Sequence, residues 1–431
     1  MIYADIETRS DPVELNKENE EKNTKKLNEL RPLWIGYFIK FQDGVIEKHQ
    51  ALQKFESVQI FDAQNPLEDF FIKLKEDCYE IKSIVRTDHP LVWDSELEAK
   101  FQAETNCGIC KRPYDPRLDN HMNWHKVRHH SHLLGDYISS AHQLCNLRVR
   151  LNSKVPLFFH NGGRFDQILI NQLFADPLFQ AKKIVDVKSI SLLPKSYEHF
   201  LCQSFKWCCE ICEILKEERS QEGKSTPFCT HSFPIQILDT YNYLGASLSK
   251  MVEELKKSCQ NFQEETIEFK PLYEWIQKKY PHDDEAKKKS YFQALTQKQF
   301  FPYNLLSNLS RLEDKKLPER HEWYDSLRQE YSSEADITYA KEVFELFKCQ
   351  NISSYLKIYL EADIGKIDYN KIEGVNGLFI CLNMRYKFPF YHFSVLLCCV
   401  LESWRRLLKK HYSLDLANFV SLREHTPLGL M

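Results

Sequence analysis

The pattern of apolar and polar positions predicts a mixed α/β protein. Residues 1–7 have the character of a short strand, and residues 155–163 of an apolar strand that ends in an Asn-Gly-Gly turn. Apolar residues recur at spacings of three and four over 336–347, and more weakly over 286–296, which predicts helices. We therefore expect sheet strands in the first half of the chain and mostly helices over residues 251–345.

Four carboxylates and one tyrosine, in three separate pieces of the chain, are the candidate chemistry. In a strand, Asp5 and Glu7 point to the same face, because they are two residues apart. Asp166 follows a strand and a turn, and it opens the next predicted helix. Tyr359 and Asp363 are four residues apart, so they share one face of a helix. None of the three pieces contains a lysine that could neutralise the acids, so the acids suit two divalent cations. Two such cations about 3.5 to 4 Å apart can catalyse the hydrolysis of a phosphodiester.

The order and surroundings of these pieces resemble the three exonuclease motifs of B-family DNA polymerases. Further segments make the chain similar to the protein-primed DNA polymerases of viruses, organellar plasmids and Polinton-type transposons. The resemblance runs over residues 1–364 and resumes at residue 395. The segments that carry it between the motifs are 158–161, 193–195, 237–248, 300–303 and 316–318.

The resemblance implies a ribonuclease H-like 3′–5′ exonuclease fold, in which helices flank a mixed sheet. It also implies two Mg²⁺ or Mn²⁺ ions at the terminal phosphodiester of single-stranded DNA, with Tyr359 positioning the attacking water. Asn161 and Phe165 resemble the residues that grip the frayed 3′ end, by hydrogen bonding and by base stacking. The metal ligands that the resemblance implies are Asp5, Glu7, Asp166 and Asp363.

The polymerase palm of this family is not recognisable in the chain. The family places its palm aspartates in D-x-x-S-L-Y-P and Y-x-D-T-D type motifs, and neither is present. The chain begins close to the first exonuclease motif and stops at Met431, about where the palm would begin. We therefore expect a fragment or degenerate copy of a DNA polymerase type B that keeps the proofreading exonuclease. Its expected partners are single-stranded DNA 3′ ends, with a terminal protein or the missing polymerase part as further candidates.

A Cys-x2-Cys pair and a His-x2-Cys pair predict a structural zinc site. Closed four-ligand sites of this composition are usually structural. The stretch between them and Asn146, which follows the last cysteine, resemble the zinc-bound ββα fold of recombination endonucleases. His130 and Asn146 match catalytic positions of that fold, but His129 stands where an aspartate is expected. We therefore favour structural zinc over a second nuclease centre. The predicted ligands are Cys107, Cys110, His142 and Cys145.

Two further groups leave alternatives open. One cluster has ligand-like spacing and is either a second zinc site or a set of free thiols. Asp239 is either a fifth acid near the metals or a cap for the element that follows it. The members of the cluster are Cys209, Cys212, Cys229 and His231.

Composition favours an intracellular globular protein. The chain has 43% hydrophobic residues, enough for a large core, and fourteen cysteines that suit metal ligation better than disulfides. Its net charge of −3 is not that of a strongly basic nucleic-acid binder, so DNA binding requires local basic groups. We expect no secretion and no membrane association, because no signal peptide precedes the first motif and no apolar run reaches ~18 residues.

These landmarks divide the chain. Residues 17–30 are expected to form a charged arm, and the helix of the third motif to end or detour at Gly365, a poor helix former. The expected parts are the exonuclease domain in two pieces (1–94 and 151–364), the zinc module (95–150), an insertion of unknown origin (365–394) and the start of the truncated polymerase region (395–431).

A second function is an alternative to the exonuclease. In that case the chain is a non-catalytic DNA- or protein-binding remnant that zinc keeps folded.

Overall fold

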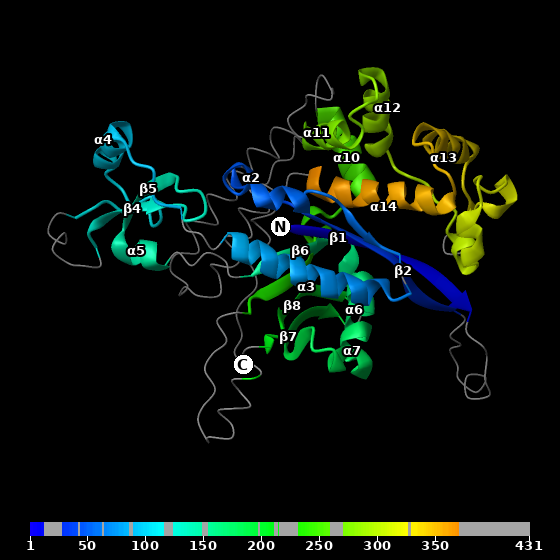
Figure 1. Ribbon diagram of the computed structural model, residues 1–431, viewed down its shortest axis with the longest axis horizontal. Coiled ribbons are helices and arrows are strands. Elements are labelled where there is room, and N and C mark those ends of the chain that lie inside the picture. Colours follow the sequence, from blue (N-terminus) through cyan, green and yellow to red (C-terminus); the bar gives the residue numbers. More distant parts are fainter. Residues whose placement is uncertain are drawn as a thin grey trace, which may run out of the picture.

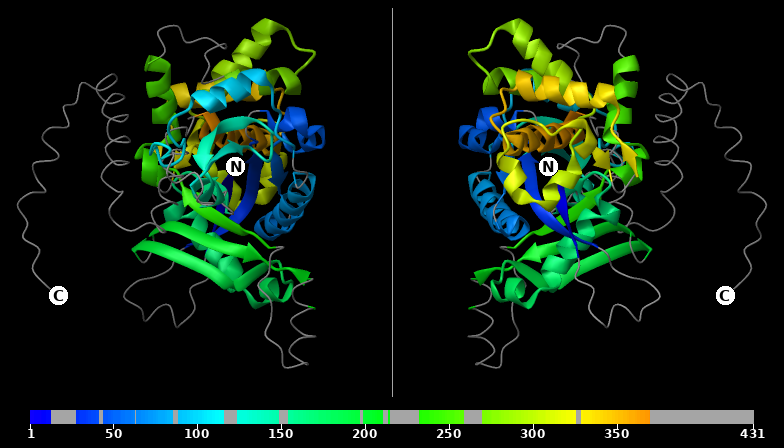
Figure 2. Two further views of the ribbon diagram at one scale, coloured as in Figure 1. Left: turned by 90° about the vertical axis from the view of Figure 1, so that its left-hand side faces the viewer. Right: turned by 90° about the vertical axis from the view of Figure 1, so that its right-hand side faces the viewer.

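The computed structural model shows an α/β protein with helices on both sides of a central sheet (Figures 1 and 2). The helices α4 and α5 and the hairpin β4–β5 lie to one side of that sheet (Figure 1). The residues that the structure describes are 1–12, 28–41, 44–62, 64–85, 89–115, 124–148, 154–196, 199–210, 214, 232–258, 270–325 and 329–369.

The central sheet has seven strands in the order β3-β2-β1-β6-β9-β8-β7. β2 is antiparallel to β1 and β3, whereas β6 is parallel to both β1 and β9. β8 is antiparallel to β9 and to β7, so the sheet is mixed. Its strands are β1 (Ile2–Pro12), β2 (Asn28–Ile39), β3 (Gln59–Phe61), β6 (Val155–Phe159), β7 (Val185–Ser196), β8 (His199–Trp207) and β9 (Pro234–Asp239). Two small hairpins are β4 (Lys126–His130) with β5 (Tyr137–His142), and β10 (Tyr324–Asp325) with β11 (Glu330–Tyr331).

Helices dominate the second half of the described chain, as the periodicity predicts. The α-helices before β9 are α2 (Val45–Lys48), α3 (Pro66–Ile84), α4 (Ser95–Ala103), α5 (Gln143–Arg148), α6 (Asp166–Ala175) and α7 (Pro177–Ala181). Those after it are α9 (Tyr241–Leu244), α10 (Leu248–Ser258), α11 (Lys270–Lys279), α12 (Glu285–Leu295), α13 (Glu334–Leu346) and α14 (Ile352–Tyr369). Short 3-10 helices are η1 (Gln50–Phe55), η3 (Gly162–Arg164), η4 (Tyr303–Ser307), η5 (Leu309–Glu313) and η6 (Arg320–Glu322).

Side chains of β1 point alternately to the two faces of the sheet and so contribute to two separate layers of the core. Ile2, Ala4 and Ile6 are buried on the face that α3 and α6 cover. Tyr3 lies on the opposite face, in a second apolar cluster with residues of α13 and α14. Because side chains of a strand alternate between the faces, Asp5 must lie on the same face as Tyr3, beneath α14.

A glycine in β2 lets α14 approach the sheet closely. Gly36 is the cross-strand partner of Asp5. A Cβ atom on Gly36 would lie 2.5 Å from Cδ1 of Ile364 and 3.3 Å from Cδ2 of Leu360, which are both fully buried residues of α14. A side chain at this position would therefore force the end of the Ile364 side chain to shift, and the absence of one lets α14 lie close to the sheet.

The β4–β5 hairpin is joined to the central part by the turn between its strands. Leu134 of this turn is buried in a small apolar cluster with Val45, Leu52 and Phe55. The ammonium group of Lys48 donates to the Leu134 carbonyl oxygen and lies 3.5 Å from a carboxylate oxygen of Asp136. The region with the predicted zinc ligands is thus packed against α2 and η1.

Two expectations about local structure need correction. α14 does not end at Gly365 but continues to Tyr369. A glycine inside a helix costs about 1 kcal/mol relative to alanine, and burial of neighbouring residues such as Ile364 is enough to offset this. The predicted arm also ends earlier than expected, because Asn28 already begins β2, where Asn28 pairs with Pro12.

Several predictions fall outside the described residues. They concern most of the arm at 17–27, the insertion and polymerase-like region beyond residue 369, and three members of the second cysteine cluster. Cys209 of that cluster is described and is a half-buried free thiol. Among the described residues, no helix combines the length and the apolar character needed to cross a membrane.

Candidate active site and candidate metal centre

Three of the predicted acids meet above the central sheet. Asp5 and Glu7 come from β1, and Asp363 comes from α14. One carboxylate oxygen from each lies within 4.8 Å of the other two, so the three could hold a metal ion. The alternation of β1 and the docking of α14 over Gly36 explain why residues so distant in sequence come together.

Asp166 lies next to this group, but its carboxylate oxygens are not within 4.8 Å of the oxygens of all three other acids. It is the first residue of α6 and is buried. Its charge acts on both Asp5 and Glu7, which places its carboxylate close to the acids of β1. The structure thus gathers all four predicted acids into one region, three of them in direct proximity.

Crowding and burial make these acids hard to ionise. Burial, and then the charges of Glu7, Asp166 and Asp363, raise the pKa of Asp5 well above its ordinary value. Burial and the charge of Asp363 raise the pKa of Glu7 to about 8, against a hydrogen bond from Tyr303 that lowers it. Burial raises the pKa of Asp166 to about 7. Among the described residues, no lysine or arginine forms an ion pair with Asp5, Glu7 or Asp166, so in the absence of a cation these carboxyl groups favour the protonated form.

Two tyrosines, not one, reach this group. Tyr359 is on α14, one turn before Asp363, as predicted. Tyr303 comes from η4, which packs against β1, and its phenol forms hydrogen bonds with Glu7 and Tyr359. Part of the Tyr303 side chain remains accessible to solvent. The sequence analysis assigned no role to Tyr303, although it belongs to the Phe-Phe-Pro-Tyr segment that carries part of the resemblance.

The turn after β6 presents the residues predicted to grip DNA. Asn161 is exposed and adopts the left-handed conformation, with φ 61°. Phe165, the residue before α6, is 37% exposed, so part of its ring is open to solvent. Asp239 lies beneath this turn, where its carboxylate accepts hydrogen bonds from backbone N–H groups. It is not within the metal-ligand group of Asp5, Glu7 and Asp363.

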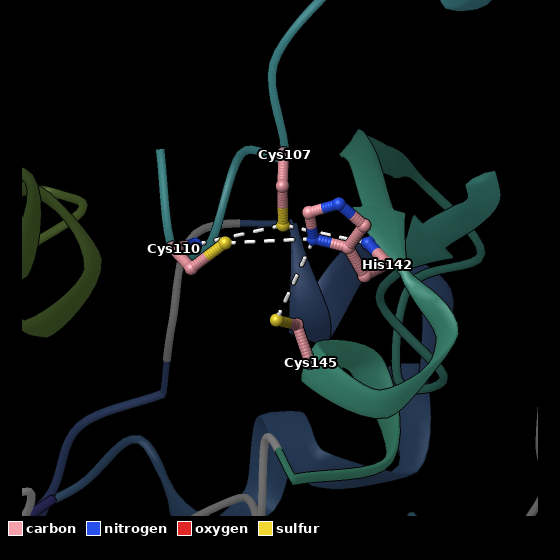
Figure 3. Close-up of side chains that lie close together, drawn as sticks. All are labelled: Cys107, Cys110, His142 and Cys145. Atoms are coloured by element: carbon pink, nitrogen blue, oxygen red, sulfur yellow. Dashed lines mark hydrogen bonds between the residues drawn. The ribbon is translucent and has the colours of Figure 1, made fainter. Parts of the chain in front are cut away.

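The predicted cysteine and histidine ligands converge (Figure 3). Their ligand atoms all lie within 4.8 Å of one another, so they could hold a metal ion. Nδ1 of His142 lies 3.5 Å from Sγ of Cys110 and 3.9 Å from Sγ of Cys145. A tetrahedron with Zn–S about 2.3 Å and Zn–N about 2.0 Å places its ligand atoms about 3.5 to 3.8 Å apart. The separation from Cys110 lies within that range, and the separation from Cys145 is slightly longer.

Local structure favours the metal-binding forms of Cys107 and His142, whereas burial raises the pKa of Cys145 to about 12. Cys107 and Cys110 lie in a tight turn that is closed by a hydrogen bond of 2.9 Å from the backbone N–H of Lys111 to the carbonyl oxygen of Cys107. Burial of the Cys107 thiol opposes ionisation, but hydrogen bonds from the backbone N–H groups of Cys110 and His142 outweigh it and lower the pKa. Burial also lowers the pKa of His142, so its ring favours the neutral form that metals require.

The residues expected at a second nuclease centre form a different contact. Nδ1 of His129 lies 2.7 Å from Oδ1 of Asn146, so the histidine that replaces the expected aspartate is engaged with the asparagine. His130 makes a ring contact with His132, with centroids 4.6 Å apart. Among the residues that the structure describes, only the two groups already named bring three or more ligand-type side chains together.

The arrangement can therefore place cations among carboxylates and phenols at an edge of the sheet where an exposed aromatic ring is also present. Comparison of the chain with protein-family models, with curated proteins and with solved structures gives no match. The geometry of the acidic group is consequently the basis for a functional assignment.

Proposed function

We propose that this chain is a metal-dependent 3′–5′ exonuclease acting on single-stranded DNA. The observation that carries the proposal is the meeting of Asp5, Glu7 and Asp363 within 4.8 Å. Carboxylates crowded in this way repel one another when ionised, and Mg²⁺ or Mn²⁺ would supply the compensating charge.

In this mechanism the four acids, Asp166 included, would hold two cations at the terminal phosphodiester. The cations supply the charge that activates water and stabilises the leaving 3′ oxygen. Tyr359 would orient the water, and Tyr303 would hold Glu7 by its hydrogen bond. The exposed ring of Phe165 is placed to stack on the terminal base.

The mixed sheet with helices on both faces is compatible with a ribonuclease H-like fold, and the relation to protein-primed B-family DNA polymerases rests on the sequence motifs. Under this proposal the Cys107–Cys145 cluster holds a structural zinc ion, because its four ligands leave no open coordination position. The chain is not expected to extend primers, because it lacks both palm motifs.

The test uses the purified full chain and a single-stranded oligonucleotide labelled at its 5′ end. We expect a ladder shortened from the 3′ end in Mg²⁺ or Mn²⁺, no products in EDTA, and protection by a nuclease-resistant 3′ linkage. Asp5→Asn and Asp363→Asn should lower kcat at least about 100-fold, because each removes a metal ligand. Glu342→Gln, at an exposed position of α13, is the matched control. Activity that persists in Asp363→Asn, or that starts at the 5′ end, would reject the proposal.

A further inference from the structure

Asp239 is the last residue of β9, beside the last residue of β6. The two strands run parallel, and Asp239 is paired with Phe159 in their register. Because parallel strands end at the same edge of a sheet, the turns that follow β6 and β9 meet there. Asp239 is only 1% exposed, so its carboxylate must find hydrogen-bond donors within the protein.

Both oxygens of this carboxylate accept from backbone N–H groups. Oδ1 accepts from Asn161 at 2.7 Å and from Tyr241 at 2.9 Å. Oδ2 accepts from Gly163 at 3.0 Å. Hydrogen bonds to an ionised acceptor are roughly twice as strong as neutral ones, so one side chain fastens the turn after β6 to the start of α9.

The turn that Asp239 holds has little room to move. Asn161 is in the left-handed region, which costs a non-glycine residue conformational energy and needs support from its surroundings. A Cβ atom on Gly163 would lie 2.5 Å from the carbonyl oxygen of Phe200 and 2.9 Å from Oδ2 of Asp239. The turn is thus fixed from both sides, and it leads directly into the exposed ring of Phe165.

The hydrogen bonds of Asp239 distinguish it from the acidic cluster. Its carboxylate, like that of Asp166, is outside the group formed by Asp5, Glu7 and Asp363, and its charge acts on Asp166. Three backbone N–H donors, however, already occupy its oxygens. We propose that Asp239 is a positioning residue that holds Asn161 and Phe165 where they grip the 3′ end of single-stranded DNA. This inference rests on the proposed exonuclease function.

Asp239→Asn is the direct test, because it keeps the shape but turns one acceptor oxygen into an NH2 donor that opposes a backbone N–H. We expect KM for single-stranded DNA to rise about tenfold and kcat to stay within about threefold, since ground-state binding is lost. The Mg²⁺ concentration for half-maximal activity should not change. Asp176→Asn is the matched control, because Asp176 also accepts a backbone N–H, from Leu178 at 2.9 Å, on α7. It should leave KM unchanged.

A double-mutant cycle with Phe165→Ala tests whether Asp239 acts through the turn. We expect the two substitutions together to raise KM by less than the product of their single effects, because Phe165→Ala already removes one of the two contacts that Asp239 positions, while that of Asn161 remains. Independent, additive effects would overturn the positioning role, and so would a change in the Mg²⁺ requirement, which would make Asp239 a metal ligand.

Two measurements keep this inference separate from the proposed function. If Asp239→Asn does not fold, amide hydrogen exchange of the wild-type chain decides, and rapid exchange at Asn161 and Gly163 would overturn the inference. If the wild-type chain has no nuclease activity, the exonuclease proposal fails by itself. The same cycle is then measured as the Kd for single-stranded DNA in Ca²⁺, and an unchanged Kd in Asp239→Asn overturns the positioning role.

Discussion

The rings of Tyr303 and Tyr359 meet edge to face, with centroids 6.1 Å apart and planes at 88°. One belongs to a 3-10 helix and the other to α14, and a hydrogen bond links their phenols. Tyr303 also bonds to Glu7, so a continuous chain of polar contacts runs from α14 through η4 to β1. This chain gives both phenols a place in the chemistry proposed for the acidic group.

Removal of either phenol should slow the reaction. Tyr359→Phe takes away the group that orients the water, and we expect kcat to fall about 10- to 100-fold. Tyr303→Phe removes the hydrogen bond to Glu7 and should lower kcat in the same direction, with the folded structure retained. The measurement is single-turnover degradation of single-stranded DNA at saturating Mg²⁺. Tyr331→Phe, at an exposed position of β11, should behave as wild type. Full activity in both active-site variants would remove the tyrosines from the mechanism.

Gly36 should be sensitive to even one added methyl group. Gly36→Ala places a Cβ atom 2.5 Å from Cδ1 of Ile364, and overpacking of this kind costs about 1 to 3 kcal/mol. Ile364→Val deletes that Cδ1 atom and alone costs about 0.5 to 1.5 kcal/mol. We expect the double variant to be more stable than the sum of the single variants, measured by urea unfolding. Strict additivity would mean that α14 does not rest on Gly36.

Without metal ions the protein should lose stability as the pH rises. Glu7 ionises near pH 4.5 when unfolded but at about 8 in the fold. The unfolded state therefore loses its proton first, so the free energy of unfolding decreases between about pH 4.5 and 8 and levels off above that range. Each unit of pKa difference corresponds to about 1.4 kcal/mol, so the total loss is substantial. Melting temperatures in EDTA at pH 5 and pH 8 measure it.

Glu7→Gln is the control for this pH dependence. It removes the titrating group, so in EDTA at pH 8 the variant should melt above the wild-type protein, although it is catalytically impaired. Added Mg²⁺ should raise the melting temperature of the wild-type chain more at pH 8 than at pH 5. An equal pH dependence in both proteins would show that Glu7 does not carry the effect.

Zinc removal should unfold the β4–β5 region and spare the exonuclease chemistry. Small metal-bound modules gain much of their folding free energy from the ion. Cys110→Ser should therefore lower the zinc content, measured by elemental analysis, and make the amides of β4 and β5 exchange rapidly. Cys349→Ser, at a free thiol after α13, is the control. A chain without zinc, or a Cys110→Ser variant with full zinc and stability, would contradict the assignment.

Positions set by local periodicity were predictable from the sequence. Strand alternation placed Asp5 and Glu7 on one face, and the four-residue spacing placed Tyr359 and Asp363 on one side of a helix. Tyr303 escaped prediction because η4 has no repeating pattern, and only its packing against β1 brings the phenol to Glu7. The continuation of α14 past Gly365 was missed because propensity is a weak prior that burial overrides.

The strand order was equally beyond local rules. β9 lies between β6 and β8, so the strand that ends in Asp239 pairs with one whose last residue is Phe159. Nothing in the spacing of the two segments fixes that choice, which follows from burial of both strands at the centre of the sheet. The sequence therefore left two alternatives for Asp239, a fifth acid or a cap, and only the structure reveals its three backbone N–H partners.

The acidic group joins Asp5, on the first strand, to Asp363, on the last described helix. During synthesis a chain emerges from its N-terminus, so β1 leaves the ribosome long before α14 does. The carboxylates of β1 therefore lack their partner, Asp363, until almost the whole described fold has been synthesised. If the chain is the exonuclease proposed above, it would be unable to cut DNA while it is incomplete, and its activity would indicate that α14 has folded onto the sheet.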